Sequence, residues 1–297
     1  MRIIQCAICK TNKYTEVLFP ETTNFAKIDK AIFSARRIPD RVHYRLLRCN
    51  KCGLIFSSPI LSEKSIRKLY RESRLTYEQE IESLKETYGH YLEKALHSSV
   101  KNPALLEIGG GSGFFLEKAK EMGLSKVYGV EPSQDAVNQA RNDIKKNMIV
   151  DFFPSRKIKN SLFDIICVFQ TLDHIIDPNS FLQACYKALR KNGLVLCIHH
   201  NTDGLSVKLL KEKSPIFDIE HIFLFNKDNL KTIFSINGFK TVEVFDVKNT
   251  FPLRYWIRMF PLPLNIKLKL IEILKFIRLD NFPITLSAGN IGIIARK

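Results

Sequence analysis

From residue 104 to the end of the chain, short apolar runs alternate with segments whose apolar residues recur at helical spacing. The runs predict strands near 104–108, 126–131, 148–152, 163–169, 193–199, 239–247 and 290–296. The segments between them predict helices near 113–122, 134–146, 178–191, 204–213 and 227–236. Strands alternating with helices are typical of a parallel sheet with crossover helices. The pattern therefore predicts an α/β fold with a seven-stranded, mostly parallel sheet and helices on both faces.

Polar and small residues at the segment ends support these predictions. Ser133 can cap the helix that follows it, and Asp177 offers a capping carboxylate before Pro178 at the first helical position. Gly193 and Gly238 are expected to end the helices before them.

Helical spacing also occurs on both sides of this region, over 62–98 and over 265–278. We therefore expect four parts in the chain: an N-terminal segment (1–60), a helical connector (61–101), the α/β core (102–250), and a helical insertion with the last core strand (251–297).

The 265–278 helix gathers apolar residues on one side, with Glu272 and Lys275 on the other. The apolar residues are Ile266, Leu270, Ile273, Leu274 and Ile277. We expect this side to pack on its own domain or to cover the substrate. The alternative is peripheral contact with an anionic membrane through residues 251–278, because an aromatic and basic segment precedes the helix.

Four of the seven cysteines form two Cys-x-x-Cys pairs near the N-terminus, and the second pair is followed by Gly53. They are Cys6, Cys9, Cys49 and Cys52. Four thiolates complete a tetrahedral zinc shell without an open position, so this spacing predicts a structural Zn²⁺ in a zinc-ribbon-like segment. A redox pair is the alternative, but it would need a thioredoxin-like βαβ unit around one pair.

The three remaining cysteines and the histidine between the two pairs are not expected to bind the metal. Cys167, Cys185 and Cys197 lie in apolar runs and are expected in the core. His43 is expected at the surface rather than as a zinc ligand.

The 297 residues carry 46 basic and 30 acidic side chains, a net charge of +16. Residues 1–74 hold 16 basic and 6 acidic groups, a net +10. This charge favours an anionic partner without choosing between nucleic acid, phosphorylated substrate and acidic lipid. Without a run of eighteen uncharged apolar residues or an apolar signal core at its start, the chain is expected to be a cytoplasmic enzyme.

The run from Leu105 to Phe115 predicts a strand that ends in a glycine-rich turn and a helix. Gly109, Gly111 and Gly113 leave room for a ligand against the main chain. Phe114 stands where a dinucleotide fingerprint needs its third glycine, and no Gly-Lys-Ser/Thr follows for a phosphate-binding loop. Both phosphate-binding interpretations are therefore weakened.

The Glu-x-Gly-x-Gly-x-Gly pattern, together with a strand ending at Glu131, resembles the class I S-adenosylmethionine-dependent methyltransferases. The resemblance implies a Rossmann-like fold and S-adenosylmethionine as cofactor. It implies that Glu131 binds the ribose hydroxyls, since a carboxylate accepts two hydrogen bonds from a diol. By the same resemblance, Glu107 and Gly109 lie near the amino-acid portion, Asp151 lies near the adenine, and Gln170 and His174 face the pocket.

The two cysteine pairs and Glu220-His221 are similar to features of methyltransferases that act on sugars and related small molecules. In the sugar C-methyltransferases the corresponding pair lies at the substrate site, which implies that His221 or Glu220 takes a proton. His199 and His200 are second candidates. The chain departs from those enzymes because it lacks their additional large C-terminal domain.

Three classes of function remain. The first is a methyltransferase that acts on a small-molecule or sugar acceptor, including a nucleotide- or lipid-linked glycan. The second is an RNA methyltransferase that binds the phosphates of RNA through the basic zinc segment. The third is a non-catalytic zinc- and cofactor-binding module, which the glycine turn and Glu131 together argue against.

Overall fold

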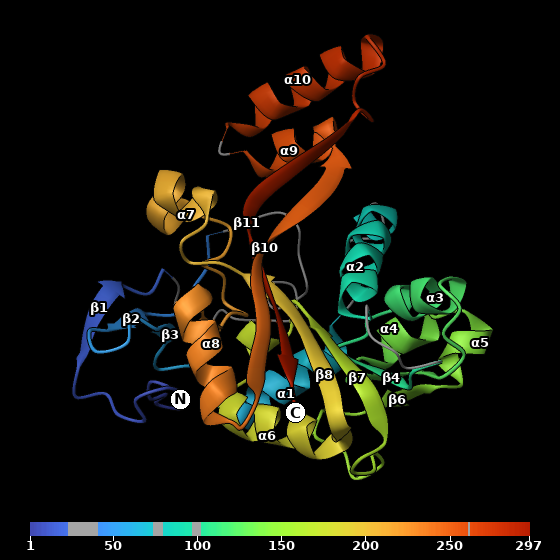
Figure 1. Cartoon of the computed structure of the whole chain (residues 1–297). Helices are drawn as coiled ribbons and strands as arrows, with labels where there is room; N and C mark the ends of the chain where they lie inside the picture. The colour runs from blue at the N-terminus through green and yellow to red at the C-terminus, as the bar shows by residue number, and fades with distance from the viewer. Residues whose placement is uncertain (23–40, 74–79, 97–101, 261) are drawn as a thin grey trace.

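The computed structural model describes residues 1–22, 41–73, 80–96, 102–260 and 262–297. Its largest element is a seven-stranded sheet in the order β10-β11-β8-β7-β4-β5-β6 (Figure 1). The strands are β4 (Leu105–Ile108), β5 (Val127–Glu131), β6 (Met148–Val150), β7 (Phe163–Phe169), β8 (Leu189–His200), β10 (Lys240–Pro252) and β11 (Pro283–Arg296). Strands β4 to β8 run parallel, and β11 is antiparallel to β8 and β10. The predicted mostly parallel sheet is confirmed.

Helices cover both faces of this sheet, as predicted (Figure 1). On one face lie α2 (Ile81–Ala95) and α3 (Phe114–Glu121), and on the other lie α6 (Pro178–Ala188) and α8 (Lys227–Ile236). Successive residues of a strand point to opposite faces of the sheet. Leu105 therefore packs in the core under α2 and α3, and Leu106 in the core under α6 and α8. Cys167, Cys185 and Cys197 are buried in these cores, which confirms their predicted place.

Two helices are shorter than the sequence pattern predicts. The 134–146 segment forms α4 (Gln134–Asn138) and α5 (Asn142–Lys145), because the chain turns at the buried Ala140. The 178–191 helix ends at Ala188, since Leu189 is extended and pairs with Phe163 of β7. The predicted N-terminal caps are confirmed: the amide of Ala136 donates to Ser133, and that of Ser180 donates to Asp177.

The last two strands continue beyond the sheet as a two-stranded arm, which the sequence pattern did not predict (Figure 1). We call residues 249–286 the arm, because Asn249 pairs with Leu286 at its base and Pro252 pairs with Pro283 further out. Helices α9 (Leu253–Met259) and α10 (Leu264–Phe276) lie between its strands in sequence. Within the described ranges, every helix is too short or too polar to cross a bilayer.

A second, four-stranded sheet has the order β1-β2-β3-β9. Strands β1 (Thr15–Phe19), β2 (Leu46–Cys49) and β3 (Ile55–Ser57) come from the N-terminal segment, whereas β9 (Phe223–Leu224) comes from the core. The connector contains α1 (Glu63–Glu72) and α2, and residues 74–79 of the predicted 62–98 helix lie outside the described residues. The proposed domain boundaries stay predictions, but β9 ties the N-terminal segment to the core.

Candidate functional site

A cavity of about 880 Å³ opens at the carboxyl ends of β4, β5, β7 and β8. Ligands of open α/β sheets bind at this edge, in the crevice between the loops that follow the strands. The cavity extends from the glycine turn after β4 to α9 of the arm. It is large enough for a cofactor and an acceptor side by side.

The glycine turn forms the inner wall of the cavity. Gly109 has a positive φ of +79°, and a Cβ there would lie 2.3 Å from Thr171 Oγ1. Gly109 and Gly111 line the cavity. Gly113 does not belong to the lining residues; it begins α3, and a Cβ there would lie 2.7 Å from Ile144. At Gly109 and Gly111 the turn therefore exposes main-chain atoms to the cavity without a side chain between them. At Gly113 it packs too closely against Ile144 for a larger residue.

Two carboxylates stand on either side of this turn. Glu131 accepts hydrogen bonds from the amides of Gly111 (3.0 Å) and Ser133 (2.9 Å), which fix its orientation at the end of β5. Burial raises the pKa of Glu131, and these two amides oppose the shift. Burial and the charge of Glu131 raise the pKa of Glu107 well above its usual range. A cationic ligand between them would relieve this cost.

Unpartnered buried polar atoms show where a ligand fits. Glu107 Oε2 and Gln170 Oε1 have no hydrogen-bond partner within the described parts of the chain, although both side chains line the cavity. Buried polar atoms normally form hydrogen bonds, so we expect each of these two oxygens to accept one from a bound ligand. An ammonium group and a hydroxyl or amine of S-adenosylmethionine are such donors, and the residues present fit that cofactor.

Asp151 and Phe152 lie at the far wall, beyond β6. Asp151 accepts hydrogen bonds from Ser155 Oγ (2.7 Å) and from the Phe152 amide (2.8 Å), and the Ser155 bond is the main reason that its pKa is lowered. The guanidinium of Arg67 lies 4.6 Å from the centre of the Phe152 ring. This flat apolar wall beside a carboxylate suits an aromatic base.

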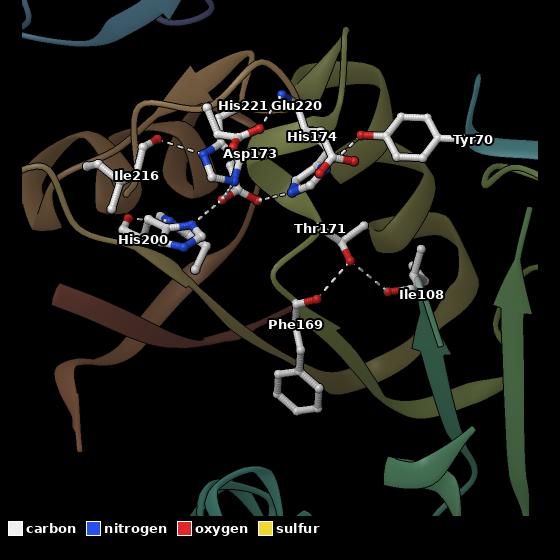
Figure 2. Close-up of polar contacts among 12 residues, drawn as sticks. Tyr70, Ile108, Phe169, Thr171, Asp173, His174, His200, Ile216, Glu220 and His221 are labelled. Carbon is white, nitrogen blue, oxygen red and sulfur yellow. Dashed lines mark hydrogen bonds and ion pairs between the residues drawn. The ribbon is translucent and has the colours of Figure 1, made fainter. Parts of the chain in front are cut away.

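Three histidines that line the cavity, His174, His200 and His221, surround a buried carboxylate behind its wall (Figure 2). Asp173 comes from the 3₁₀ turn Leu172–His174 after β7 and is fully buried. Its Oδ2 lies 2.8 Å from His200 Nδ1 and 3.8 Å from His221 Nε2, and its Oδ1 lies 3.7 Å from His174 Nε2. Although burial alone would raise it, the pKa of Asp173 lies well below its usual range because the three rings surround it.

Hydrogen bonds fix the tautomers of these rings. An ionised Asp173 can only accept, so His200 donates its Nδ1–H to it. The Ile216 carbonyl, 2.6 Å from His221 Nδ1, likewise accepts, so His221 keeps its lone pair on Nε2. Nε2 of His221 and Oδ2 of Asp173 are thus two acceptors that face each other, an arrangement that a proton on His221 stabilises.

The third ring is held differently. His174 Nδ1 lies 2.7 Å from the Tyr70 hydroxyl of α1, and both side chains line the cavity (Figure 2). Burial lowers the pKa of His174 to about 4, although Asp173 opposes the shift. His174 is therefore neutral near pH 7 and serves as a polar wall between the cofactor end and the histidine end.

Not all of the other expected catalytic residues lie at the cavity. Glu220 and His221 both line the cavity, and so does His200. His199 is fully buried, with its ring 5.3 Å from that of Phe225, and is not one of the lining residues. Asp173 and Tyr70 were not predicted as site residues, although Asp173 directly precedes the predicted site residue His174 in the sequence.

The four expected zinc ligands come together in the N-terminal segment. Cys6 Sγ lies 3.4 Å from Cys52 Sγ, Cys49 Sγ lies 3.8 Å from Cys9 Sγ, and all four sulfurs lie within 4.8 Å of one another. Sulfurs bound tetrahedrally at about 2.3 Å from zinc would lie about 3.8 Å apart, so the donor set fits this ion. His43 is only 1% exposed and contacts Glu212, so its predicted surface position is wrong; the segment packs on the core there.

This cysteine segment contacts the loop that carries His221. Ser57 of β3 donates its hydroxyl to the His221 carbonyl (2.8 Å) and its amide to the Ile222 carbonyl (2.8 Å). The Cys52 carbonyl accepts a 2.6 Å hydrogen bond from Asn229 of α8. The sequence gives no sign of these contacts, which join residues more than 160 positions apart.

The sheet order, the glycine turn and the carboxylate after β5 together define an S-adenosylmethionine-dependent methyltransferase of class I. A family model described as "Methyltransferase domain" matches residues 79–244, more than half of the 297 residues. The chain belongs to this methyltransferase family.

Two curated relatives show the range of acceptors among similar proteins. A ubiquinone biosynthesis O-methyltransferase of Bradyrhizobium diazoefficiens is 28% identical over 109 residues, which cover 35% of this chain and 43% of the relative. A tRNA U34 carboxymethyltransferase of Alteromonas mediterranea is 28% identical over 165 residues, covering 52% and 49% respectively. The chain thus spans less than half the length of these relatives.

A solved structure supports the fold. A chain of the complex between the Haloferax volcanii Trm112 methyltransferase activator and its methyltransferase superposes with a TM-score of 0.51. The identity is 14%, and the match covers 73% of this chain and 92% of that one. At this identity the likeness concerns the fold alone.

Proposed function

We propose that the chain transfers a methyl group to a hydroxyl or an activated carbon of a small-molecule or sugar acceptor, including a nucleotide- or lipid-linked glycan. The observation that carries this proposal is the group of Asp173, His200 and His221 at the acceptor end of the cavity. Such acceptors lose a proton on methylation, and this group can take it.

At the cofactor end, Glu131 is proposed to bind the ribose hydroxyls with the lone pairs that its two amide bonds leave free. Glu107 would face the ammonium group, Gln170 and His174 the middle of the ligand, and Asp151 the adenine. When bound, S-adenosylmethionine supplies a methyl group on a positively charged sulfur that leaves as a neutral thioether.

At the acceptor end, His221 is proposed to take the proton on Nε2. Protonation there turns two facing acceptors into an ion pair with Asp173, so proton uptake itself creates a favourable contact. His200 holds Asp173 in place through its Nδ1–H, and the buried Glu220 completes the polar wall. The same three side chains could also hold a divalent cation, since one ligand atom of each lies within 4.8 Å of the others.

The four cysteines are proposed to bind one structural Zn²⁺. Four sulfur ligands leave no position for water or substrate, so this ion takes no part in the reaction. Its effect on activity would pass through Ser57 to the main chain at His221.

A second candidate, methylation of RNA, is favoured by the net +10 of residues 1–74 and by the similarity to a tRNA-modifying enzyme. The two candidates are separated by incubating the full chain with isotopically labelled S-adenosylmethionine and either RNA or a small-molecule and lipid extract. We expect label in the extract, identified by mass spectrometry. Label in RNA alone would reverse this order.

Replacing Glu131 with alanine is expected to weaken S-adenosylmethionine binding by a factor on the order of 10²–10⁴. The substitution removes two charge-assisted hydrogen bonds to the ribose, each contributing about 1.5–3 kcal/mol to binding in favourable cases. Calorimetric titration measures the affinity, with Asp135→Ala, an exposed carboxylate on α4, as the matched control. Equal affinities of the wild type and the Glu131 variant would remove the ribose assignment.

A further inference from the structure

The arm exposes a large apolar surface in the part of the chain that the structure describes. None of the thirteen residues of α10 is buried. Ile266, Leu270, Ile273 and Ile277 form one stripe along it and are 37–49% exposed, and Phe276 is 88% exposed. The expected packing of this stripe in the core of the domain is therefore wrong, because the arm carries α10 away from the sheet (Figure 1). The alternative, that this side covers the substrate, stays a prediction.

Basic residues accompany these apolar side chains. Residues 251–282 contain six basic residues and two acidic ones, a net +4. Arg254 and Arg258 are tied to Asp280 and Glu80 by ion pairs, whereas Lys269 and Lys275 lie exposed on α10 itself. Lys269 borders the apolar stripe, whereas Lys275 lies on the other side of the helix. An apolar stripe bordered by a basic residue, on an arm with a net positive charge, matches the polarity of an anionic lipid surface, where phosphates lie above acyl chains.

Some exposed apolar residues of the arm and of α7 also line the cavity. Trp256, Met259 and Phe260 of the α9 region line the cavity, and Phe260 is also 58% exposed. Leu205 and Leu209 of α7 (Leu205–Leu210) line it as well and are exposed. These apolar residues thus line the same cavity as His200 and His221.

A second copy of the chain fits this surface less well. In a two-fold symmetric contact the same patch lies on both sides, so the lysines of one arm would face those of the other. Like charges brought together oppose such a contact, whereas lipid phosphates neutralise them.

We propose that the arm docks on an anionic phospholipid surface through the stripe of α10 and Lys269 at its border, with the mouth of the cavity turned toward the lipid. The docking itself does not depend on the chemistry of the cavity. Combined with the proposed function, it indicates an amphiphilic acceptor whose apolar part lies between α7 and α9.

Vesicle flotation with the full chain tests the docking. We expect the protein to rise with vesicles of phosphatidylglycerol and phosphatidylcholine, and to partition about tenfold less onto phosphatidylcholine alone. Leu270→Ser/Ile273→Ser and Lys269→Glu are each expected to lower partitioning at least about tenfold. The control is Ile236→Ser/Val242→Ser, which replaces two apolar residues exposed outside the arm and should leave partitioning unchanged.

Three results would overturn the docking proposal: a wild type that stays with the dense fraction, arm variants that float like the wild type, or a dimer in light scattering that the arm variants abolish. Calorimetric affinity for S-adenosylmethionine shows that each variant is folded. Vesicle binding without methyl transfer to any extract would instead count against the proposed function and leave the docking intact.

Discussion

Replacing Asp173 with asparagine is expected to lower kcat by a factor on the order of 10²–10³ while changing the affinity for S-adenosylmethionine little. Asparagine keeps the shape of the side chain and can still accept the Nδ1–H of His200, but it carries no charge. Protonated His221 would then face a neutral amide at the 3.8 Å contact, and proton uptake would lose its stabilisation. Steady-state turnover and calorimetric binding of the same preparations measure the two effects separately.

A double-variant cycle assigns this loss to the proton acceptor. If His221 takes the proton and Asp173 stabilises it, His221→Ala and Asp173→Asn should each lower kcat strongly, and the double variant little further. Asp203→Asn, an exposed carboxylate just after β8, is the control and should retain wild-type turnover. Additive losses, or a full effect in His200→Ala with none in His221→Ala, would move the role away from His221.

Replacing Cys49 with serine is expected to abolish stoichiometric zinc and to unfold the N-terminal segment. Metal binding contributes about 10–16 kcal/mol to folding in zinc-finger peptides, as much as the whole stability of many domains. Cys49 is fully buried at the end of β2, so no solvent ligand can replace its sulfur without disturbing that strand. Metal analysis and thermal unfolding measure these losses.

The same variant is expected to lose turnover more than cofactor affinity. The glycine turn and Glu131 depend on β4 and β5, whereas the main chain at His221 is held by Ser57 of the cysteine segment. Cys185→Ala, a buried cysteine on α6 outside the metal set, is the control and should keep one zinc per chain. A wild-type protein without stoichiometric zinc, purified without chelator, would remove the proposal.

The sequence predicted the sheet well because its signals are local. Each strand of the core is a short apolar run bounded by turn residues, and capping residues such as Ser133 and Asp177 act within three positions. The helix over 178–191 was predicted too long because helical periodicity continues to Leu189, where pairing with β7 overrides it. The outer arm was missed since its two strands stabilise each other without a sheet behind them.

The residues of the site also fall into those that the local sequence identifies and those that only the fold brings together. Gly109, Gly111 and Glu131 could be identified from one turn and one strand end, whose spacing along the chain fixes their distance in space. Asp173 could not, because its importance depends on His200 and His221 arriving from the end of β8 and from the loop before β9. Nothing in the local sequence distinguishes a buried carboxylate with three imidazole neighbours from an exposed one.

By itself the sequence determined the α/β sheet, the glycine turn with its carboxylate, and the cysteine spacing that suits zinc, because periodicity, turn chemistry and ligand spacing act over a few residues. Only the tertiary structure decided that His200 and His221 meet at Asp173, that Ser57 joins the cysteine segment to His221, and that no residue of α10 is buried. These are long-range contacts, and the chain brings their partners together only when the whole sheet has formed.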